Sequence, residues 1–425
     1  VITFTIADGN GNEITRDILL TLRDTIVPEV TGLPTDTTGY VDANCEFEIP
    51  DYTSEVIASD NCGTVNVTQN PTGTILSGHG TTQVITFTIA DGNGNEITRD
   101  ILLTLRDTIA PDFTVPPDDT ICRNLDCTID INPSITGDVT DESDNCSTGI
   151  EAVIANDDVS NIGDCDNAGY IERTWRLEDY AGNRTEKIQI IWVEPVAKVN
   201  LTPESDTICN RELTNVLINS STNATEGIRF KYSIEPDNPL DVNVDYNGPT
   251  EDLSAGYRIQ DQLINTSNNI QFVRIIVTPY LIDSNGNQKC IGINDTSFVY
   301  VNPTPEMEVT VPDTLICNDT DVDFTTDSLV STLGTVRYQV DISYSSGDVS
   351  GTLSDGSVHD MGTLTDHLLN TGDDVETVTY TFTPYIEGGT NSGDCNGGIT
   401  EQVTIYVNPT PEMEVTVPDT LICND

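Results

Sequence analysis

The stretch VITFTIADGNGNEITRDILLTLRDTI, at residues 1–26, recurs without a change at residues 84–109. In the second copy Ile85, Phe87 and Ile89 alternate with threonines, which places the apolar side chains on one face of an extended strand. The Asp-Gly-Asn-Gly-Asn run that follows is typical of a tight turn, because glycine and asparagine tolerate positive φ. The stretch therefore predicts a β-hairpin that buries one face.

A second repeat indicates that such hairpins belong to a tandem array of domains. The run NPTPEMEVTVPDTLICND, at residues 302–319, recurs at residues 408–425. Between the repeats, runs such as TVTYTFTPYI alternate apolar and polar residues, and turn signals recur at intervals typical of an immunoglobulin-like sandwich. We predict an all-β protein, a tandem array of Ig-like β-sandwich domains that forms an elongated, disulfide-stapled rod.

The repeats also set the expected domain boundaries. We expect the sequence to open in the closing strands of one domain and to end in the opening strand of another, with targeting and anchoring signals outside it. The predicted segments are the closing part of a domain at 1–26, sandwiches at 27–109, 110–194, 195–301 and 302–407, and the start of a further domain at 408–425.

The charge of the chain excludes two classes of partner. Lys and Arg number 17 against 70 Asp and Glu, which gives a formal net charge of −53. Such a chain is repelled by nucleic acid and by anionic membrane surfaces. No apolar run is long enough to span a bilayer, so direct membrane insertion is not expected either. Acidity can also indicate disorder, but the alternating apolar runs predict folded strands with solvated carboxylates.

The chain has 11 cysteines, and their spacing predicts disulfides within each domain. Disulfides indicate an oxidising, extracellular compartment. The three histidines are scattered, so no zinc site is expected. Two cysteine pairs share residues 110–194, which leaves the connectivity there open, and Cys423 repeats Cys317, so its partner is expected outside the sequence. The predicted pairs are Cys45–Cys62, Cys127–Cys146, Cys122–Cys165, Cys209–Cys290 and Cys317–Cys395.

Catalytic motifs are missing from the sequence. It contains no Gly-x-Ser-x-Gly elbow, no His-Glu-x-x-His pair and no phosphate-binding glycine loop. We therefore expect that the protein is not an enzyme. Trp175 and Trp192 could stack on a sugar, but each lies in a predicted strand, where a tryptophan more often packs in the core.

Calcium is the candidate ligand, and no cofactor is otherwise required. Asp91, Asn93 and Asn95 are spaced like the opening of an EF-hand loop, but Glu96 stands where that loop needs glycine. A plain hairpin turn is the alternative interpretation.

A second calcium hypothesis concerns the linkers between domains. Asp24 and Asp107 precede the predicted linkers, and either could join carboxylates of the next domain, such as Asp112, around one ion. The ion would then stiffen the linker.

Two families resemble these domains. Ala-Ser-Asp-Asn-Cys at 58–62, Ser-Asp-Asn-Cys at 143–146 and the terminal Asp-x-x-Gly-Asn hairpins resemble HYR (hyalin-repeat) domains. The Thr-Pro-Tyr, Cys-x-Gly and Val-Asn-Pro-Thr-Pro motifs of residues 195–407 resemble PKD-like repeats of Bacteroidetes surface proteins. Together they are similar to giant adhesins exported by the type IX secretion system, such as SprB-type gliding-motility adhesins.

The resemblance implies an adhesive role at the cell surface. We expect an extracellular stalk, part of a filament attached to the outer membrane, that serves surface attachment and gliding. Its expected partners are the secretion and gliding machinery of the cell envelope and, through a distant tip, an external surface or polysaccharide. The alternatives are that the domains themselves bind polysaccharide or a host surface, or that they form a static coat or matrix.

Recurrent Asp-Thr-Ile and Asp-Thr-Leu tripeptides look like the acceptor motif for O-glycosylation in Bacteroidetes. The alternative is that Asp-Thr only begins strands after linkers. The candidate acceptors are Thr25, Thr108, Thr120, Thr207, Thr314 and Thr420.

Overall fold

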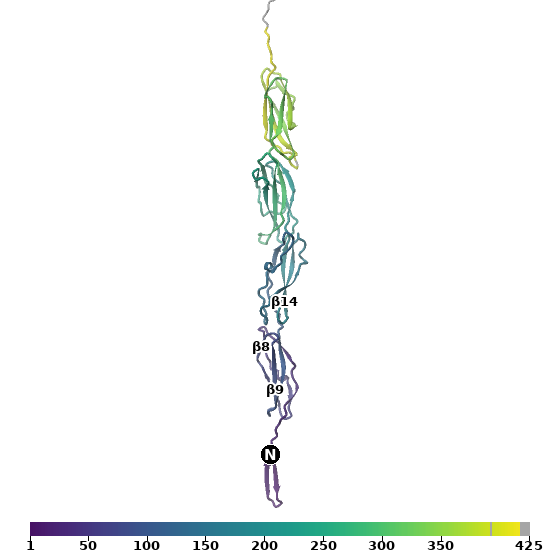
Figure 1. Ribbon diagram of the computed structural model, residues 1–425, viewed down its shortest axis with the longest axis vertical. Coiled ribbons are helices and arrows are strands. Elements are labelled where there is room, and N and C mark those ends of the chain that lie inside the picture. Colours follow the sequence, from purple (N-terminus) through teal and green to yellow (C-terminus); the bar gives the residue numbers. More distant parts are fainter. Residues whose placement is uncertain (392, 417–425) are drawn as a thin grey trace, which may run out of the picture. The chain divides into compact units, whose positions relative to one another are not determined.

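The computed structural model describes residues 1–391 and 393–416, and the all-β prediction is confirmed (Figure 1). Helical structure in these residues is limited to η1 (Thr53–Glu55) and α1 (Pro133–Thr136). None of the helices described could cross a bilayer. The chain divides into two compact units, each described by itself below. Unit 1 comprises Val1–Asp119, Ile131–Asn161 and Tyr170–Trp192, and unit 2 comprises Thr120–Asp130, Ile162–Gly169 and Val193–Asp425.

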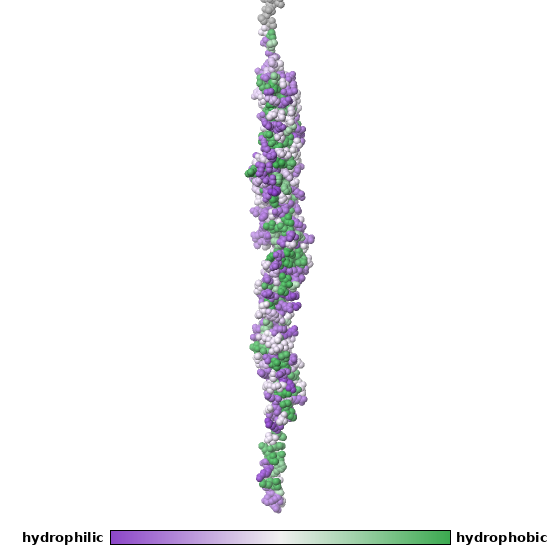
Figure 2. All heavy atoms as spheres, viewed as in Figure 1, coloured by the Kyte–Doolittle hydropathy of each residue, from purple (hydrophilic) through white to green (hydrophobic). Residues whose placement is uncertain are grey.

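Unit 1 contains the predicted hairpin twice, in two surroundings. β1 (Ile2–Ala7) and β2 (Glu13–Ile18) form a two-stranded sheet by themselves, and Phe4 is 52% exposed. In the identical second copy Phe87 is fully buried, because further strands flank that hairpin and cover its apolar face. The hydrophobic spheres of the first copy are visible at the lower end of Figure 2.

The first sandwich of unit 1 is built around the second copy of the hairpin. Its central sheet has the order β4-β10-β9-β7, and the pairs β3-β6 and β5-β8 lie outside that sheet. Ile85, Phe87, Ile89 and Leu103 form the fully buried centre of the core. The strands are β3 (Glu29–Gly32), β4 (Thr37–Tyr40), β5 (Glu46–Glu48), β6 (Ile57–Ser59), β7 (Asn66–Asn70), β8 (Ile75–Ser77), β9 (Thr82–Ala90) and β10 (Glu96–Arg106).

A second sandwich follows, with a polar group in its core. Its sheet has the order β11-β14-β13-β12. Arg173 is 1% exposed and forms an ion pair with Asp157, with 2.8 Å between Nε and Oδ1. It also donates to Thr136 Oγ1 and to the Ile131 carbonyl oxygen, so the buried charge is well partnered. The strands are β11 (Asp119–Cys122), β12 (Val153–Asp158), β13 (Gly169–Glu178) and β14 (Arg184–Glu194).

In unit 2 a third sandwich packs the sheet β16-β24-β22-β18 against β15-β17-β20. β23 pairs with the end of β22, and β19 pairs with β21. The core includes Phe230, Ile275 and Val277, all fully buried. The strands are β15 (Asn200–Thr202), β16 (Ser205–Ile208), β17 (Val216–Asn219), β18 (Ile228–Pro236), β19 (Val242–Asp245), β20 (Arg258–Ile259), β21 (Gln262–Asn265), β22 (Gln271–Ile282), β23 (Gln288–Ile291) and β24 (Asp295–Val301).

The fourth sandwich repeats this plan with the sheets β25-β27-β31-β29 and β26-β33-β32-β28-β30. Its core includes the aromatic rings of Phe324, Tyr380 and Phe382. The predicted domain boundaries stay predictions, although these cores fall within the predicted ranges. The strands are β25 (Met307–Thr310), β26 (Leu315–Ile316), β27 (Thr320–Ser328), β28 (Thr335–Tyr344), β29 (Val349–Gly351), β30 (Ser357–Asp360), β31 (Gly362–Asn370), β32 (Glu376–Glu387) and β33 (Glu401–Val407).

A buried asparagine recurs at matching places in the third and fourth sandwiches. Asn265 is 3% exposed and donates to the Val301 carbonyl oxygen, at the end of the closing strand. Asn370 is 1% exposed and donates in the same way to the Val407 carbonyl oxygen. The two sandwiches therefore share a polar closure as well as an apolar core.

Replacing Asp157 with alanine should destabilise the second sandwich by about 3 kcal/mol, because the Arg173 charge would stay buried without its carboxylate. Glu178→Ala is the matched control. Its ion pair with Arg184 is exposed, with side-chain exposures of 42% and 58% respectively, so its loss should cost under about 1 kcal/mol. Urea unfolding of both variants measures the difference, and equal costs would contradict the role given to Arg173.

Candidate functional site at the sandwich junctions

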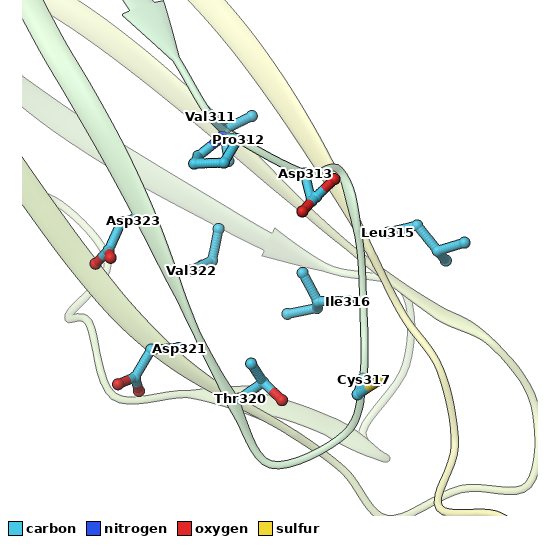
Figure 3. Close-up of a pocket in the computed structure, with 10 residues that line it drawn as sticks. All are labelled: Val311, Pro312, Asp313, Leu315, Ile316, Cys317, Thr320, Asp321, Val322 and Asp323. Atoms are coloured by element: carbon cyan, nitrogen blue, oxygen red, sulfur yellow. The ribbon is translucent and has the colours of Figure 1, made fainter.

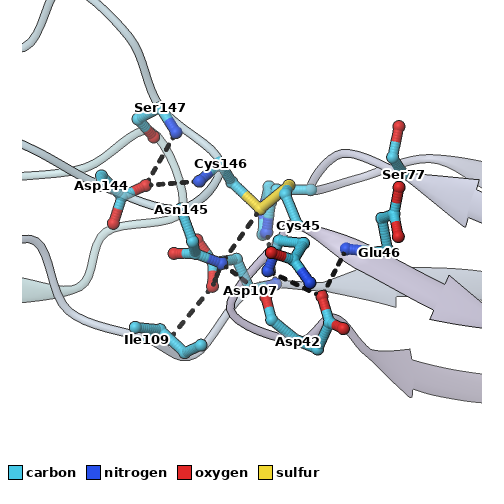
Figure 4. The surroundings of a disulfide bond; sticks show 12 residues. Asp42, Cys45, Glu46, Ser77, Asp107, Ile109, Asp144, Asn145, Cys146 and Ser147 are labelled. Atoms are coloured by element: carbon cyan, nitrogen blue, oxygen red, sulfur yellow. Dashed lines mark hydrogen bonds between the residues drawn. A yellow bond between two sulfur atoms is a disulfide. The ribbon is translucent and has the colours of Figure 1, made fainter.

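A disulfide links the first sandwich to the second within unit 1. Cys45 lies in the loop after β4 and bonds to Cys146, with 5.0 Å between the two Cα atoms (Figure 4). The neighbouring Asn145 side chain donates to the Asp42 carbonyl oxygen of that loop at 3.0 Å. The loop and the second sandwich are therefore held by a covalent bond and by a hydrogen bond.

Two disulfides of unit 2 also join different sandwiches. Cys122, at the end of β11, bonds to Cys290 in β23 of the third sandwich. Lys289, next to Cys290, forms an ion pair with the buried carboxylate of Glu194, at the end of β14. Cys209, after β16, bonds to a cysteine of the fourth sandwich, Cys395.

A buried asparagine reinforces the junction between the third and fourth sandwiches. Asn302 is fully buried, and its side-chain amide donates to the carbonyl oxygens of Leu333 and Gly389, at 3.1 and 2.5 Å. Leu333 donates its N–H to Asn302 Oδ1 at 2.8 Å. The segment between the two sandwiches is thereby hydrogen-bonded to loops of the fourth.

The predicted pairing of Cys45 with Cys62 is wrong because the two lie at opposite ends of the sandwich. The Cys45 loop lies beside the end of β10, since Val41 N–H donates to the Arg106 carbonyl oxygen. The Cys62 carbonyl oxygen instead accepts from Asn93, in the turn before β10. β10 has 11 residues, so at about 3.3 Å per residue it separates the two by roughly 35 Å. A disulfide needs Cα atoms within about 7 Å.

The same geometry overturns the predicted pairs Cys209–Cys290 and Cys317–Cys395. Cys209 follows a strand that pairs with the end of β24, opposite the start of β22, whereas Cys290 lies beside the end of β22. β22 has 12 residues and is roughly 40 Å long. Cys317 and Cys395 are likewise placed beside the two ends of the 12-residue β32.

The predicted pairs Cys127–Cys146 and Cys122–Cys165 are also replaced. Cys127 bonds to Cys165, with 5.5 Å between Cα atoms. Arg123 donates to the carbonyl oxygens of residues 162 and 163, which brings the two cysteine loops together. Cys146 is then free to face Cys45, and Cys122 to face Cys290.

Two described cysteines, Cys62 and Cys317, are exposed free thiols. Cys62 has the same Ser-Asp-Asn-Cys context as Cys146, and Cys317 has the Ile-Cys-Asn context of Cys209. Cys146 and Cys209, which occupy the equivalent positions, are each bonded to a cysteine of another sandwich. Cys423 lies outside the described residues.

Three carboxylates converge beside the disulfide of unit 1. One oxygen from each of Asp107, Asp144 and Asp179 lies within 4.8 Å of the others. Asp107 follows β10, Asp144 precedes the bonded Cys146, and Asp179 opens the turn between β13 and β14. Asp107 and Asp179 are 1% and 5% exposed, so charge is concentrated where little water reaches it.

Local hydrogen bonds hold each of these carboxylates in place. Asp144 Oδ2 accepts from the N–H groups of Cys146 and Ser147, at 2.9 and 2.7 Å (Figure 4). Asp179 accepts from the backbone and side-chain nitrogens of Asn183. The Ser-Asp-Asn-Cys loop and the Asp-x-x-Gly-Asn turn therefore fix the positions of Asp144 and Asp179 through hydrogen bonds.

A second cluster in unit 1 has the same composition. Oxygens of Asp24, Asp60 and Asp91 lie within 4.8 Å of one another. Burial alone would raise the pKa of Asp91, but hydrogen bonds from Asn95 and Asn93 outweigh it and hold that pKa below its usual value. Asp91 is therefore charged at neutral pH.

These clusters contain some of the predicted calcium ligands and omit others. Asp24, Asp107 and Asp91 belong to them, but Asp112 does not, since it pairs with Lys187 at 2.7 Å. Cation binding itself stays a prediction.

The predicted asparagine ligands have another role. Asn95 Nδ2 donates to Asp91 at 2.6 Å, and Asn93 Nδ2 donates to the Cys62 carbonyl oxygen at 3.3 Å. Their amide nitrogens therefore hold the turn and the cluster carboxylates in place.

Sequence reasoning missed Asp60, Asp144 and Asp179 as members of the clusters. Each stands in a Ser-Asp-Asn-Cys or Asp-x-x-Gly-Asn motif, but the motifs do not show that a loop and a turn meet at the end of the preceding linker.

The candidate glycosylation sites are mostly accessible. Thr25, Thr108, Thr120 and Thr314 are exposed, Thr207 is half-buried, and Thr420 lies outside the described residues. Modification of these threonines stays a prediction.

The two tryptophans differ. Trp175 is 1% exposed and donates to Gln189 at 3.0 Å, as expected for a core residue. Trp192 is 42% exposed, with its ring 5.4 Å from that of Tyr170, so it is not a core residue.

Disulfide mapping of the chain should find Cys45–Cys146, Cys122–Cys290, Cys127–Cys165 and Cys209–Cys395. Cys62 and Cys317 should react with an alkylating reagent. The decisive variant is Cys146→Ser. It should make Cys45 reactive and leave Cys62 as reactive as before, measured by peptide mass spectrometry without reduction. A Cys45–Cys62 peptide would contradict the assignment.

Comparison with known proteins gives one family match. Residues 206–305 and 314–411 match the PKD-like domain family. No curated protein matches the chain.

Three solved structures illustrate the structural likeness. Protocadherin Gamma B2 extracellular cadherin domains 3–6 are 9% identical, with 91% of this chain and 100% of that chain covered and a TM-score of 0.28. FdeC, an Escherichia coli adhesin, is 13% identical, with 83% and 98% covered and a TM-score of 0.27. Titin domains I67–I69 are 9% identical, with 90% and 99% covered and a TM-score of 0.29. The two tandem matches to the PKD-like domain family, at residues 206–305 and 314–411, correspond to the third and fourth sandwiches.

Proposed function

We propose that this chain is a non-catalytic stalk segment of a filamentous cell-surface adhesin. The observation that carries the proposal is that three disulfides, Cys45–Cys146, Cys122–Cys290 and Cys209–Cys395, join residues of different sandwiches. A domain that folds and works alone gains most from internal bridges. Bridges to neighbours benefit a chain whose task is to keep successive domains connected under load.

The surface chemistry fits an extracellular filament. With a net charge of −53, neighbouring copies repel each other, which keeps filaments apart and soluble. The disulfides require an oxidising compartment. Export by a type IX system, attachment to the outer membrane and a role in gliding are the finer parts of the proposal, and they rest on the family resemblance.

A catalytic role finds little support. Ser357 Oγ lies 2.7 Å from His359 Nε2, but both stand on the edge strand β30, and no carboxylate is recorded on the other ring nitrogen within the described chain. Burial and then the nearby Arg337 lower the pKa of His359. His367 has the reverse shift, because hydrogen bonds to Asp321 and Asp319 raise its pKa.

A hollow beside the free thiol of Cys317 also lacks groups that could take part in catalysis. It has a volume of about 350 Å³, and Cys317 lies in its lining (Figure 3). Its lining includes the carboxylates of Asp313, Asp321 and Asp323 but no histidine or lysine that could activate the thiol.

Labelling of living cells with antibodies against residues 110–301 tests the proposal. A mobile gliding adhesin predicts label that lies on the cell surface and travels along it. Fixed surface label would keep the adhesin and overturn the gliding role, and label confined to the cell interior would overturn the stalk function. Pre-immune serum is the control.

A further inference from the structure

The carboxylate cluster of Asp107, Asp144 and Asp179 is incompletely satisfied by the protein. Asp107 Oδ2, Asp144 Oδ1 and the neighbouring Asn145 Oδ1 are buried and accept no hydrogen bond from the described residues. Asp107 is 1% exposed. A buried oxygen without a donor is costly, and more so when it carries charge. The site therefore lacks a positively charged or hydrogen-bonding group.

No side chain of the described protein supplies that group. Lys187, a nearby cation in the same sandwich, pairs with Asp112, and no ion pair to Asp107, Asp144 or Asp179 is present among the described residues. Three converging carboxylates then leave an excess of negative charge, which mutual repulsion makes unfavourable.

We propose that a calcium ion binds between Asp107, Asp144 and Asp179. The candidate ligand atoms are all oxygens, which suits a hard cation. Asp107 Oδ2 and Asp144 Oδ1 accept no hydrogen bond from the described residues, and Asp179, whose two oxygens each accept from Asn183, would contribute a remaining lone pair. Zinc is disfavoured because the converging side chains are all carboxylates, the adjoining His79 uses Nδ1 to accept from the Asp107 backbone N–H at 3.1 Å, and Cys146 is held in its disulfide. Calcium also tolerates the irregular geometry of ligands drawn from three separate loops.

The second cluster supports the assignment because it repeats the details. Asp60 Oδ2 accepts from Cys62 N–H at 2.7 Å while Asp60 Oδ1 is buried without a partner, which matches Asp144. Asp24 Oδ1 accepts from Ile26 N–H at 3.1 Å, which matches the bond from Ile109 to Asp107. We assign a second calcium ion to Asp24, Asp60 and Asp91.

Each ion would join a linker to the sandwich that follows it. Asp107 belongs to the segment leaving β10, whereas Asp144 and Asp179 belong to loops of the second sandwich. Calcium and the Cys45–Cys146 disulfide would then hold one junction by independent means. This inference does not rest on the proposed stalk function, since a binding measurement on the purified chain reads out the sites alone.

Calorimetric titration of the chelator-treated chain with calcium chloride tests the assignment. We expect two ions per chain. Asp144→Asn and Asp60→Asn should each remove one ion, because the amide keeps an oxygen for the loop N–H groups but loses the charge. The double variant should bind none.

Asp112→Asn is the matched control, an aspartate close to Asp107 in sequence but outside the cluster, and it should still bind two ions. Far-UV circular dichroism in chelator checks that every variant folds. Absence of binding at millimolar calcium, or two ions retained by the double variant, would overturn the assignment.

Discussion

The length of the central strands constrains everything else in this structure. A strand of 11 or 12 residues separates the ends of a sandwich by roughly 35–40 Å, and a disulfide tolerates only a few ångströms between its cysteines. When a sandwich carries one cysteine at each end, the two cannot meet. Each can bond only with a cysteine at the end of another sandwich. The fold therefore places disulfides between domains where cysteine spacing predicts disulfides within them.

The junctions then carry several kinds of interaction at once. In unit 1 the Cys45–Cys146 bond is accompanied by the Asn145 hydrogen bond to the Asp42 carbonyl oxygen and by the aspartate cluster. In unit 2 the Cys209–Cys395 bond is accompanied by buried Asn302. Covalent bonds and hydrogen bonds, and in unit 1 also charges, therefore converge on the short segments between sandwiches.

Much of the fold follows from local sequence. The alternation of Ile85, Phe87 and Ile89 with threonines is enough to predict β9 and its buried face, because strand periodicity is a local property. The two copies of this stretch also show the limit of that reasoning. Phe4 and Phe87 share one local sequence, yet one is 52% exposed and the other buried, since burial depends on strands that come from elsewhere in the chain.

The candidate site depended on information that spacing does not contain. Cysteines 17 residues apart, such as Cys45 and Cys62, look like partners until the topology places them at opposite ends of β10. Asp107 and Asp24 could be singled out because they precede linkers. Asp144 and Asp179 could not, because only the fold brings a loop and a turn of the second sandwich to the end of β10.

Single-molecule stretching of the whole chain, oxidised and then reduced, tests most directly that disulfides join neighbouring sandwiches. The loops closed by Cys45–Cys146 and Cys209–Cys395 span 101 and 186 residues, which at about 3.5 Å per residue withhold roughly 100 nm of chain. We predict that full extension of the oxidised chain falls short of the reduced chain by about that length. The pairs predicted from spacing, Cys45–Cys62, Cys122–Cys165, Cys209–Cys290 and Cys317–Cys395, close loops of 17, 43, 81 and 78 residues and would withhold roughly 75 nm. A difference of that smaller size would contradict the account.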